Sequence, residues 1–404
     1  MHLHRRLAAA ALLAIGALAT PAAAETEVVV WHAYRGAEKA AIEKVAAAYN
    51  ASHPGTKVTT LAVPFDAFAD KISAAVPRGR GPDVFIYAQD RLGGWIEAGN
   101  TVEPIDFFLD APTKGRFIPT TMDAMTYRGT VYGLPVNYKV ITLIYNKKLV
   151  PTPPRTSAEL EATAKKLTDK AAGRYGLAYA YNDYYYHAAL QNAFGGRVFD
   201  AGAKPVINAP ENAKALEQLL RWQALGILPA EPSSALINAL FNEGKSGMVF
   251  SGPWFLGEIS PGIDWGLALL PTIAAAGNKP MRPWMTVEGA FIAAPSKHKD
   301  AAYDFVKFLT DVEAGKTMAL EGRQTPANTA VYTDAKVAAD PVIRAFRSQV
   351  EVAVPMPNLP EMTMVWSPVT TMMAAVTHGS VTPQAGLDTA EAQVLKDVAN
   401  LRKK

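Results

Sequence analysis

A chain of 404 residues, 49% of them hydrophobic, is longer than one hydrophobic core usually supports, so its composition favours two packed lobes and excludes a disordered protein. Its formal charge of +3 gives no electrostatic argument for a nucleic-acid partner. Because the chain contains no cysteine, thiol nucleophiles, thiolate metal sites and a lipid anchor on an amino-terminal cysteine are excluded.

The first 24 residues have the pattern of a secretory signal. A basic start over residues 2–6 precedes an apolar segment over 7–19, and three alanines at 22–24 form a cleavage site. The apolar segment is too short to span a bilayer. We expect cleavage after Ala24, which removes two arginines and no acid, and a mature protein in the periplasm.

Strand and helix patterns then alternate along the chain. Short apolar runs predict strands, and apolar residues at helical spacing predict helices. The alternation predicts parallel strand pairing with right-handed crossovers. The predicted strands are 28–31, 58–63, 84–86 and 140–145, the last after a turn at Gly133-Leu134-Pro135, and the predicted helices are 38–49, 66–76, 212–225 and 301–309.

The stretch GPDVFIYAQDRLGGW, from Gly81 to Trp95, carries the strongest functional signal. Its apolar run predicts a buried strand whose carboxyl end opens into a loop, where open α/β sheets bind ligands. Asp90 supplies an acceptor and Arg91 a fork of donors beside Tyr87. Such a combination suits a polyhydroxylated ligand with apolar ring faces, which indicates a sugar.

This stretch resembles the corresponding part of periplasmic maltose/maltodextrin-binding proteins, the family 1 solute-binding proteins of ABC importers. Further blocks resemble the family in the same order along the chain: YGLP at 132–135, LIYNKKL at 143–149, FNEGK at 241–245, SGPW at 251–254, LPT at 270–272 and MPNLP at 356–360. Each block alone is weak, but the ordered set covers nearly all of the mature chain.

The resemblance implies a two-lobed α/β periplasmic-binding-protein fold of class II, with the ligand cleft between lobes joined by crossing segments. Lobe 1 is expected to combine 25–137 with 288–336, and lobe 2 to combine 138–287 with 337–404. It also implies a monomer that is not an enzyme, needs no cofactor, and delivers a saccharide to the permease subunits of an ABC transporter in the inner membrane.

The family's sugar-binding positions carry over residue by residue. Its aromatic platforms match Tyr87, Tyr185, Trp254 and Trp366, with Tyr186 adjoining them, and its paired hydroxyl ligands match Asp90 and Arg91. Asp183 stands where the family usually has a glutamate. Turn residues around Trp254 and Trp366 predict that both lie outside regular elements, whereas Trp31, Trp222 and Trp265 are expected to pack in cores.

Other positions depart from the family. Tyr34 and Arg35 replace an Asp-Lys pair, Lys139 replaces an acidic sugar ligand, and Thr370 replaces an arginine. Because an ammonium only donates hydrogen bonds, Lys139 reverses the polarity of its subsite. Arg35 and Lys139 together raise the hypothesis of a different saccharide, or of a ligand with an anionic group.

Two other classes of function stay open from the residues alone. Consecutive tyrosines and a histidine at 184–187 match the way some solute-binding proteins hold ferric iron. A secreted glycosidase would use two of Asp83, Asp90, Asp183 and Glu288 as its acid/base pair. Trp284 and Glu288 lie near a crossing segment, where ligand contact is also open.

Overall fold

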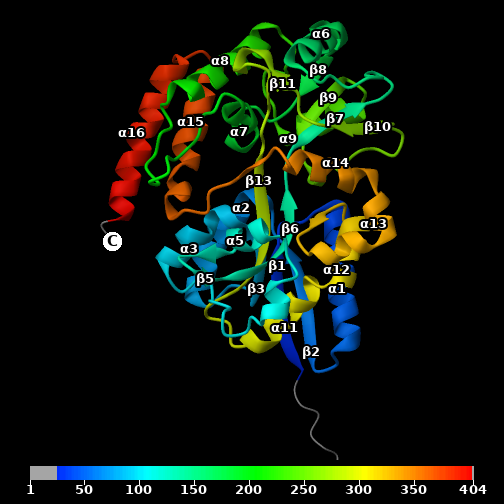
Figure 1. Cartoon of the computed structure of the whole chain (residues 1–404), viewed down its shortest axis with the longest axis vertical. Helices are drawn as coiled ribbons and strands as arrows, with labels where there is room; N and C mark the ends of the chain where they lie inside the picture. The colour runs from blue at the N-terminus through cyan, green and yellow to red at the C-terminus, as the bar shows by residue number, and fades with distance from the viewer. Residues whose placement is uncertain (1–24, 403–404) are drawn as a thin grey trace, which may run out of the picture.

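The computed structural model describes residues 25–402, so the expected signal sequence lies outside the described residues. Figure 1 shows two lobes, one above the other, with long segments crossing between them. We call lobe 1 the lobe built on the seven-stranded sheet and lobe 2 the lobe built on the four-stranded sheet. Over residues 25–402, no helix is both long and apolar enough to cross a membrane.

The sheet of lobe 1 has the order β14-β6-β13-β3-β1-β2, with β15 also pairing with β13. As predicted, β1 pairs in parallel with β2 and β3, but β13 runs antiparallel to both β3 and β6, so the sheet is mixed. Its strands are β1 Thr26–His32, β2 Thr56–Ala62, β3 Val84–Ala88, β6 Gly133–Lys139, β13 Trp284–Ile292, β14 Thr325–Pro326 and β15 Val354–Pro355.

Apolar side chains explain the central position of β3. Val84, Phe85 and Ile86 are at most 2% exposed, as expected for a strand covered on both faces. The ring of Phe85 packs edge-on against Trp95 with ring centroids 5.3 Å apart. The helices of this lobe are α1 Gly36–Ser52, α2 Phe65–Ala75, α3 Leu92–Ala98, α4 Ala111–Lys114, α5 Pro119–Ala124, α11 Lys299–Leu309, α12 Val312–Leu320 and α13 Ala335–Ala339.

Lobe 2 has the sheet order β10-β7-β9-β8, with strands β7 Thr142–Asn146, β8 Tyr175–Ala178, β9 Ser246–Ser251 and β10 Trp265–Ala268. Its core contains Trp222, which is fully buried against Phe250, as the sequence predicts for that tryptophan. Its helices are α6 Ser157–Leu167, α7 Tyr184–Ala193, α8 Pro210–Ala224, α9 Ser234–Asn242, α10 Pro253–Leu256, α14 Pro341–Val350, α15 Trp366–Thr377 and α16 Pro383–Leu401.

Two short hairpins complete the described strands. They are β4 Thr126–Tyr127 with β5 Thr130–Val131, and β11 Thr272–Ile273 with β12 Lys279–Pro280. In Figure 1, β6 and β13 run upward side by side from lobe 1 toward lobe 2. The proposed lobe boundaries at 137/138 and 287/288 fall inside these two paired strands and stay predictions.

The predicted turn at Gly133-Leu134-Pro135 is wrong, because these residues form the buried start of β6. Pro135 lacks an N–H group, and the ladder accommodates it by a register shift: Pro135 pairs with Gly289 and Asn137 with Glu288, which leaves Val136 as a bulge. Because β6 continues to Lys139, the strand predicted over 140–145 begins only at Thr142, as β7.

Candidate functional site

The predicted ligand residues converge from both lobes on the region between them. Asp90 and Arg91 lie in a 3-10 turn, η2 (Gln89–Arg91), directly after β3 of lobe 1. The lobe 2 residues come from the starts of three helices: Asp183 is the N-cap of α7, Trp254 lies in α10, and Trp366 begins α15. Segments far apart in the sequence therefore meet at one place.

The sequence predicts Trp254 and Trp366 outside regular elements, and this prediction is wrong for both, since each lies in a helix. Pro253 begins α10, where its fixed φ and missing N–H suit the first helical position. Trp366 follows another 3-10 turn, η6 (Pro360–Met364), and opens α15. Proline near a tryptophan indicates a turn, but proline also suits the first turn of a helix, as it does in α10 and η6.

Helix α7 distributes its three tyrosines around its axis, about 100° apart per residue. Tyr184 points into the core of lobe 2, where its hydroxyl donates to Gln191 Oε1 at 2.6 Å. Tyr185 and Tyr186 keep partial exposure and lie beside Trp254, with ring centroids 6.1 and 6.4 Å away. The tyrosine hydroxyls therefore do not converge as iron ligands would.

These rings belong to a larger aromatic cluster on lobe 2. Trp284, the first residue of the crossing strand β13, packs in the core of lobe 2 and lies at the centre of the cluster, with centroids 5.0 Å from Tyr184 and 6.0 Å from Trp366. Since Trp284 is only 2% exposed, it supports the cluster from within, whereas Trp254 and Trp366 are half-buried. The aromatic cluster is Tyr184, Tyr185, Tyr186, Trp254, Trp284 and Trp366.

Asp90 and Arg91 face this cluster from lobe 1. The guanidinium of Arg91 lies over the ring of Trp366, 5.7 Å from its centroid, and its Nε is 3.3 Å from Asp90 Oδ2. Asp90 is only 5% exposed. Burial disfavours its charged form and raises the pKa of its carboxyl to about 6, and the cation of Arg91 offsets this only in part.

Asp183 caps α7 by accepting a hydrogen bond from the backbone N–H of Tyr185 at 2.9 Å. The residue is exposed, yet the surrounding protein displaces enough water to raise the pKa of its carboxyl to about 6. The negative charge of Asp66, on lobe 1, acts in the same direction.

Tyr34 and Arg35 are placed differently from one another. Arg35 is exposed, and its Nε lies 2.8 Å from Glu258 Oε1 just beyond α10, so the pair joins the two lobes. Tyr34 is 3% exposed and its hydroxyl accepts a hydrogen bond from Asn137 Nδ2 at 3.0 Å. Arg35 is therefore an exposed, ion-paired residue where the two lobes meet, whereas Tyr34 is held inside the protein.

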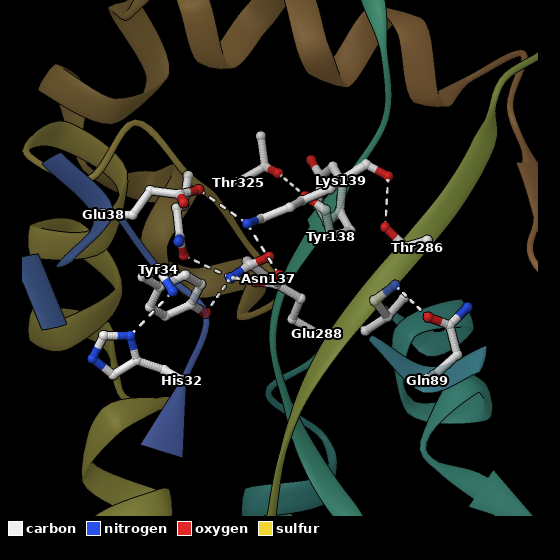
Figure 2. A network of polar contacts seen from close by, with 12 residues as sticks. His32, Tyr34, Glu38, Gln89, Asn137, Tyr138, Lys139, Thr286, Glu288 and Thr325 are labelled. Atoms are coloured by element: carbon white, nitrogen blue, oxygen red, sulfur yellow. Dashed lines mark hydrogen bonds and ion pairs between the residues drawn. The ribbon is translucent and has the colours of Figure 1, made fainter. Parts of the chain in front are cut away.

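Lys139 is buried rather than presented to solvent, with 7% exposure. Figure 2 shows its ammonium between two carboxylates, 2.9 Å from Glu38 Oε1 and 3.0 Å from Glu288 Oε1. Burial alone would lower the pKa of Lys139, but the two carboxylates outweigh it and raise the pKa. Burial raises the pKa of Glu38, against the attraction of Lys139.

We name Glu38, Lys139 and Glu288 the ion triad. It joins α1 to the two crossing strands, since Lys139 ends β6 and Glu288 lies in β13. The polarity reversal expected from Lys139 is therefore compensated inside the protein, because Glu38 and Glu288 surround the cation with negative charge. The ammonium of Lys139 is therefore not an unpaired cation available to an anionic ligand.

Amide side chains extend the ion triad into a buried network (Figure 2). Asn137 Nδ2 lies 3.0 Å from Glu288 Oε2 and 2.6 Å from Gln324 Oε1. Gln89, directly before Asp90, accepts a hydrogen bond from the backbone N–H of Val287 at 2.7 Å. The network thus fixes the start of the ligand loop against the crossing strand β13.

Glu38, Asn137 and Gln324 could not be predicted from the sequence because their partners are distant in the chain; Glu38 and Lys139, for example, are 101 residues apart. Glu38 did carry one signal. It shares the buried face of α1 with Ala41, Ile42 and Val45, and a carboxylate on an apolar helix face indicates a buried partner.

The carboxylates proposed for a glycosidase are largely engaged elsewhere. Asp83 accepts hydrogen bonds from Val29 N at 3.0 Å and from Ser296 Oγ at 2.6 Å, and Glu288 belongs to the ion triad. Among residues 25–402, no group of three or more His, Cys, Asp or Glu side chains is arranged to hold a metal ion. Two of the four carboxylates, Asp83 and Glu288, are therefore engaged in contacts within the protein.

Comparisons with known proteins show which family this chain resembles. A family model described as bacterial extracellular solute-binding protein matches residues 34–316. The maltotriose-binding protein of Pyrococcus abyssi (strain GE5 / Orsay) is 34% identical, over 84% of this chain and 75% of that protein. The galactooligosaccharide-binding protein of Bacillus subtilis (strain 168) is 26% identical, over 90% of this chain and 88% of that protein.

A solved structure has a fold similar to that of this chain. The Thermus thermophilus maltotriose binding protein bound with maltotriose superimposes with a TM-score of 0.85 at 27% identity, covering 92% of this chain and 100% of that chain. The two-lobed α/β fold that the sequence predicts is confirmed. The chain belongs to the bacterial extracellular solute-binding protein family.

Proposed function

We propose that this chain is the substrate-binding component of a carbohydrate ABC importer, and that it captures maltose, maltotriose or a related oligosaccharide between its lobes. The observation that carries the proposal is the aromatic cluster of lobe 2 opposite Asp90 and Arg91 of lobe 1. Sugar rings lie with their C–H faces on aromatic planes, and carboxylates accept their hydroxyl hydrogens. The names of the similar proteins support the same ligand class.

Binding would work through lobe closure. A saccharide held by Asp90 and Arg91 on one side and by Asp183, Trp254 and Trp366 on the other uses both contact sets only when the lobes are together. Its differential affinity then shifts the hinge equilibrium toward the closed form. A micromolar dissociation constant corresponds to about 8 kcal/mol, which a few stacking contacts and charge-assisted hydrogen bonds supply.

The cellular setting is part of the proposal. Removal of residues 1–24 would release the mature chain into the periplasm, where the closed form would deliver its saccharide to membrane permease subunits. Family membership and the lipoprotein relatives of maltooligosaccharide ABC transporters support a role outside the cytoplasm. No bond is made or broken in this role, so the carboxylates act as hydrogen-bond acceptors rather than as an acid/base pair.

A different neutral saccharide is the second candidate. The relative named for galactooligosaccharides supports it, as do Tyr34 and Arg35 at a position where the maltose binders usually carry an Asp-Lys pair. An anionic sugar is less well supported by the geometry. Both cations that suggested it are already paired, Lys139 with two glutamates and Arg35 with Glu258.

Isothermal titration calorimetry tests the proposal directly. Maltose, maltotriose, a galactooligosaccharide, trehalose and an acidic sugar are titrated into the mature chain. We expect micromolar or tighter binding of a maltooligosaccharide, weakened at least about tenfold by Trp254→Ala or Trp366→Ala, since each removes a stacking surface. Trp265→Phe, in β10 and outside the aromatic cluster, is the matched control. Absence of binding to every saccharide would refute the proposal.

A further inference from the structure

Phe65 is a large apolar side chain that remains 58% exposed. It is the first residue of α2, and it follows Pro64, which ends the connection from β2. Single exposed hydrophobic residues are ordinary on protein surfaces, so exposure alone carries no argument. The surroundings of Phe65 give it significance.

The ring of Phe65 stacks on Tyr87, with centroids 5.4 Å apart and planes inclined by 25°. Phe68, one helical turn later, stacks on the same tyrosine at 5.0 Å and 4°. Tyr87 is consequently only 6% exposed, although its position matches a sugar platform of the family. The aromatic surface that lobe 1 presents to solvent here is therefore the ring of Phe65 rather than that of Tyr87.

The start of α2 also faces lobe 2. The charge of Asp66, the residue after Phe65, acts both on the hydroxyl of Tyr87 and on the carboxyl of Asp183, which begins α7 on the opposite lobe. In Figure 1, α2 lies at the top of lobe 1, toward lobe 2. Phe65 thus stacks on Tyr87 at the end of α2 that is next to Asp66, on the side of lobe 1 toward lobe 2.

We propose that Phe65 is an additional stacking platform that extends the saccharide site along the start of α2, so that the site accommodates and favours longer oligosaccharides. The inference rests on the proposed function. A further sugar ring would lie on the exposed face of Phe65, and its hydroxyls would donate to Asp66 and Asp183. Both carboxylates are exposed, which suits contact with the outer end of an oligosaccharide whose inner sugar rings contact the aromatic cluster.

Affinity as a function of chain length tests this platform. Maltose, maltotriose and maltotetraose are titrated calorimetrically into the wild-type chain and into Phe65→Ala. We expect the variant to bind the longest saccharide about three- to tenfold more weakly, the range of one aromatic stacking contact, and to bind maltose with wild-type affinity. Phe65→Leu keeps an apolar group on Tyr87 but removes the flat ring, so it should lose the same preference for longer chains.

Phe107→Ala is the matched control. Phe107 is 94% exposed and belongs to the same lobe, but it packs on Phe108, which stacks on Tyr303 of α11 at the far end of lobe 1 in Figure 1. Its removal should leave all three affinities unchanged.

The outcomes separate the two proposals. An equal loss for every chain length in Phe65→Ala would show that Phe65 only supports Tyr87 and would overturn the platform, as would no loss at all. A wild-type chain that binds maltose but none of the longer saccharides more tightly would overturn the platform alone. A wild-type chain that binds none of the three would overturn the proposed function and the platform together.

Discussion

Lys139→Met removes the cation of the ion triad and leaves two carboxylates facing one another. Its ammonium lies 2.9 Å from Glu38 and 3.0 Å from Glu288, and Lys139 and Glu38 are 7% and 5% exposed. At an effective dielectric constant of about 20, two unit charges at such a distance attract one another by about 6 kcal/mol. Breaking a buried pair typically costs about 3–5 kcal/mol, because the remaining charge is left unpaired.

We therefore expect Lys139→Met to lower the free energy of unfolding by about 3–5 kcal/mol near neutral pH, measured by urea denaturation followed by circular dichroism. The loss should shrink at acidic pH. Burial already raises the pKa of Glu38, and a carboxyl with a raised folded-state pKa contributes stability at low pH that is lost as pH rises through that pKa. Adding Glu38→Gln to the variant should restore part of the stability.

Lys147→Met is the matched control, since Lys147 forms an equally short pair, 2.7 Å from Asp264, in which both side chains are exposed. Its urea midpoint should change little, because exposed ion pairs contribute little. A structural role for the ion triad is refuted if Lys139→Met keeps the wild-type urea midpoint and loses only saccharide affinity. That result would make the ammonium a ligand donor, as the sequence alone suggested.

Asp90→Asn should raise the urea midpoint of the ligand-free chain while weakening saccharide binding, because burial raises the pKa of Asp90 to about 6 and an amide avoids that cost; a lower midpoint with unchanged affinity would contradict this. Saccharide affinity should fall as pH drops through about 6, where Asp90 and Asp183 gain protons and lose acceptor capacity. Calorimetry at about pH 5 should show a saccharide affinity about tenfold lower for each carboxylate than at neutral pH. An affinity that does not change with pH would count against both carboxylates as acceptors. Arg35→Ala removes the cross-lobe pair with Glu258 and should speed saccharide release about two- to fivefold in stopped-flow fluorescence, whereas an unchanged rate would exclude a latch.

The sequence predicts the parts of the fold that depend on local pattern. The apolar run Val84 to Ile86 and its closing Gly-Pro-Asp predict β3, because a strand covered on both faces needs consecutive apolar residues. The prediction fails at Gly133-Leu134-Pro135, where a proline that suggests a turn is accommodated by a bulge against β13. That bulge depends on a strand about 150 residues away, which no local pattern reports.

In the candidate site, too, some features could be predicted from local motifs and others depend on distant segments of the chain. Asp90, Arg91, Trp254 and Trp366 could be predicted because motifs mark them, and the structure brings them together. The environment of Lys139 could not, because its partners come from α1 and β13 and decide whether the cation meets a ligand or a glutamate. The sequence shows that residue 139 carries a positive charge, whereas only the tertiary contacts show that Glu38 and Glu288 balance that charge.

The crystal structure of the chain with maltotriose tests the central claim most directly. We predict glucose rings with their faces on Trp254 and Trp366, and hydroxyls within hydrogen-bond distance of the carboxylates of Asp90 and Asp183, with both lobes contacting the sugar. Maltotriose bound away from the aromatic cluster, or held by one lobe alone, would contradict the account.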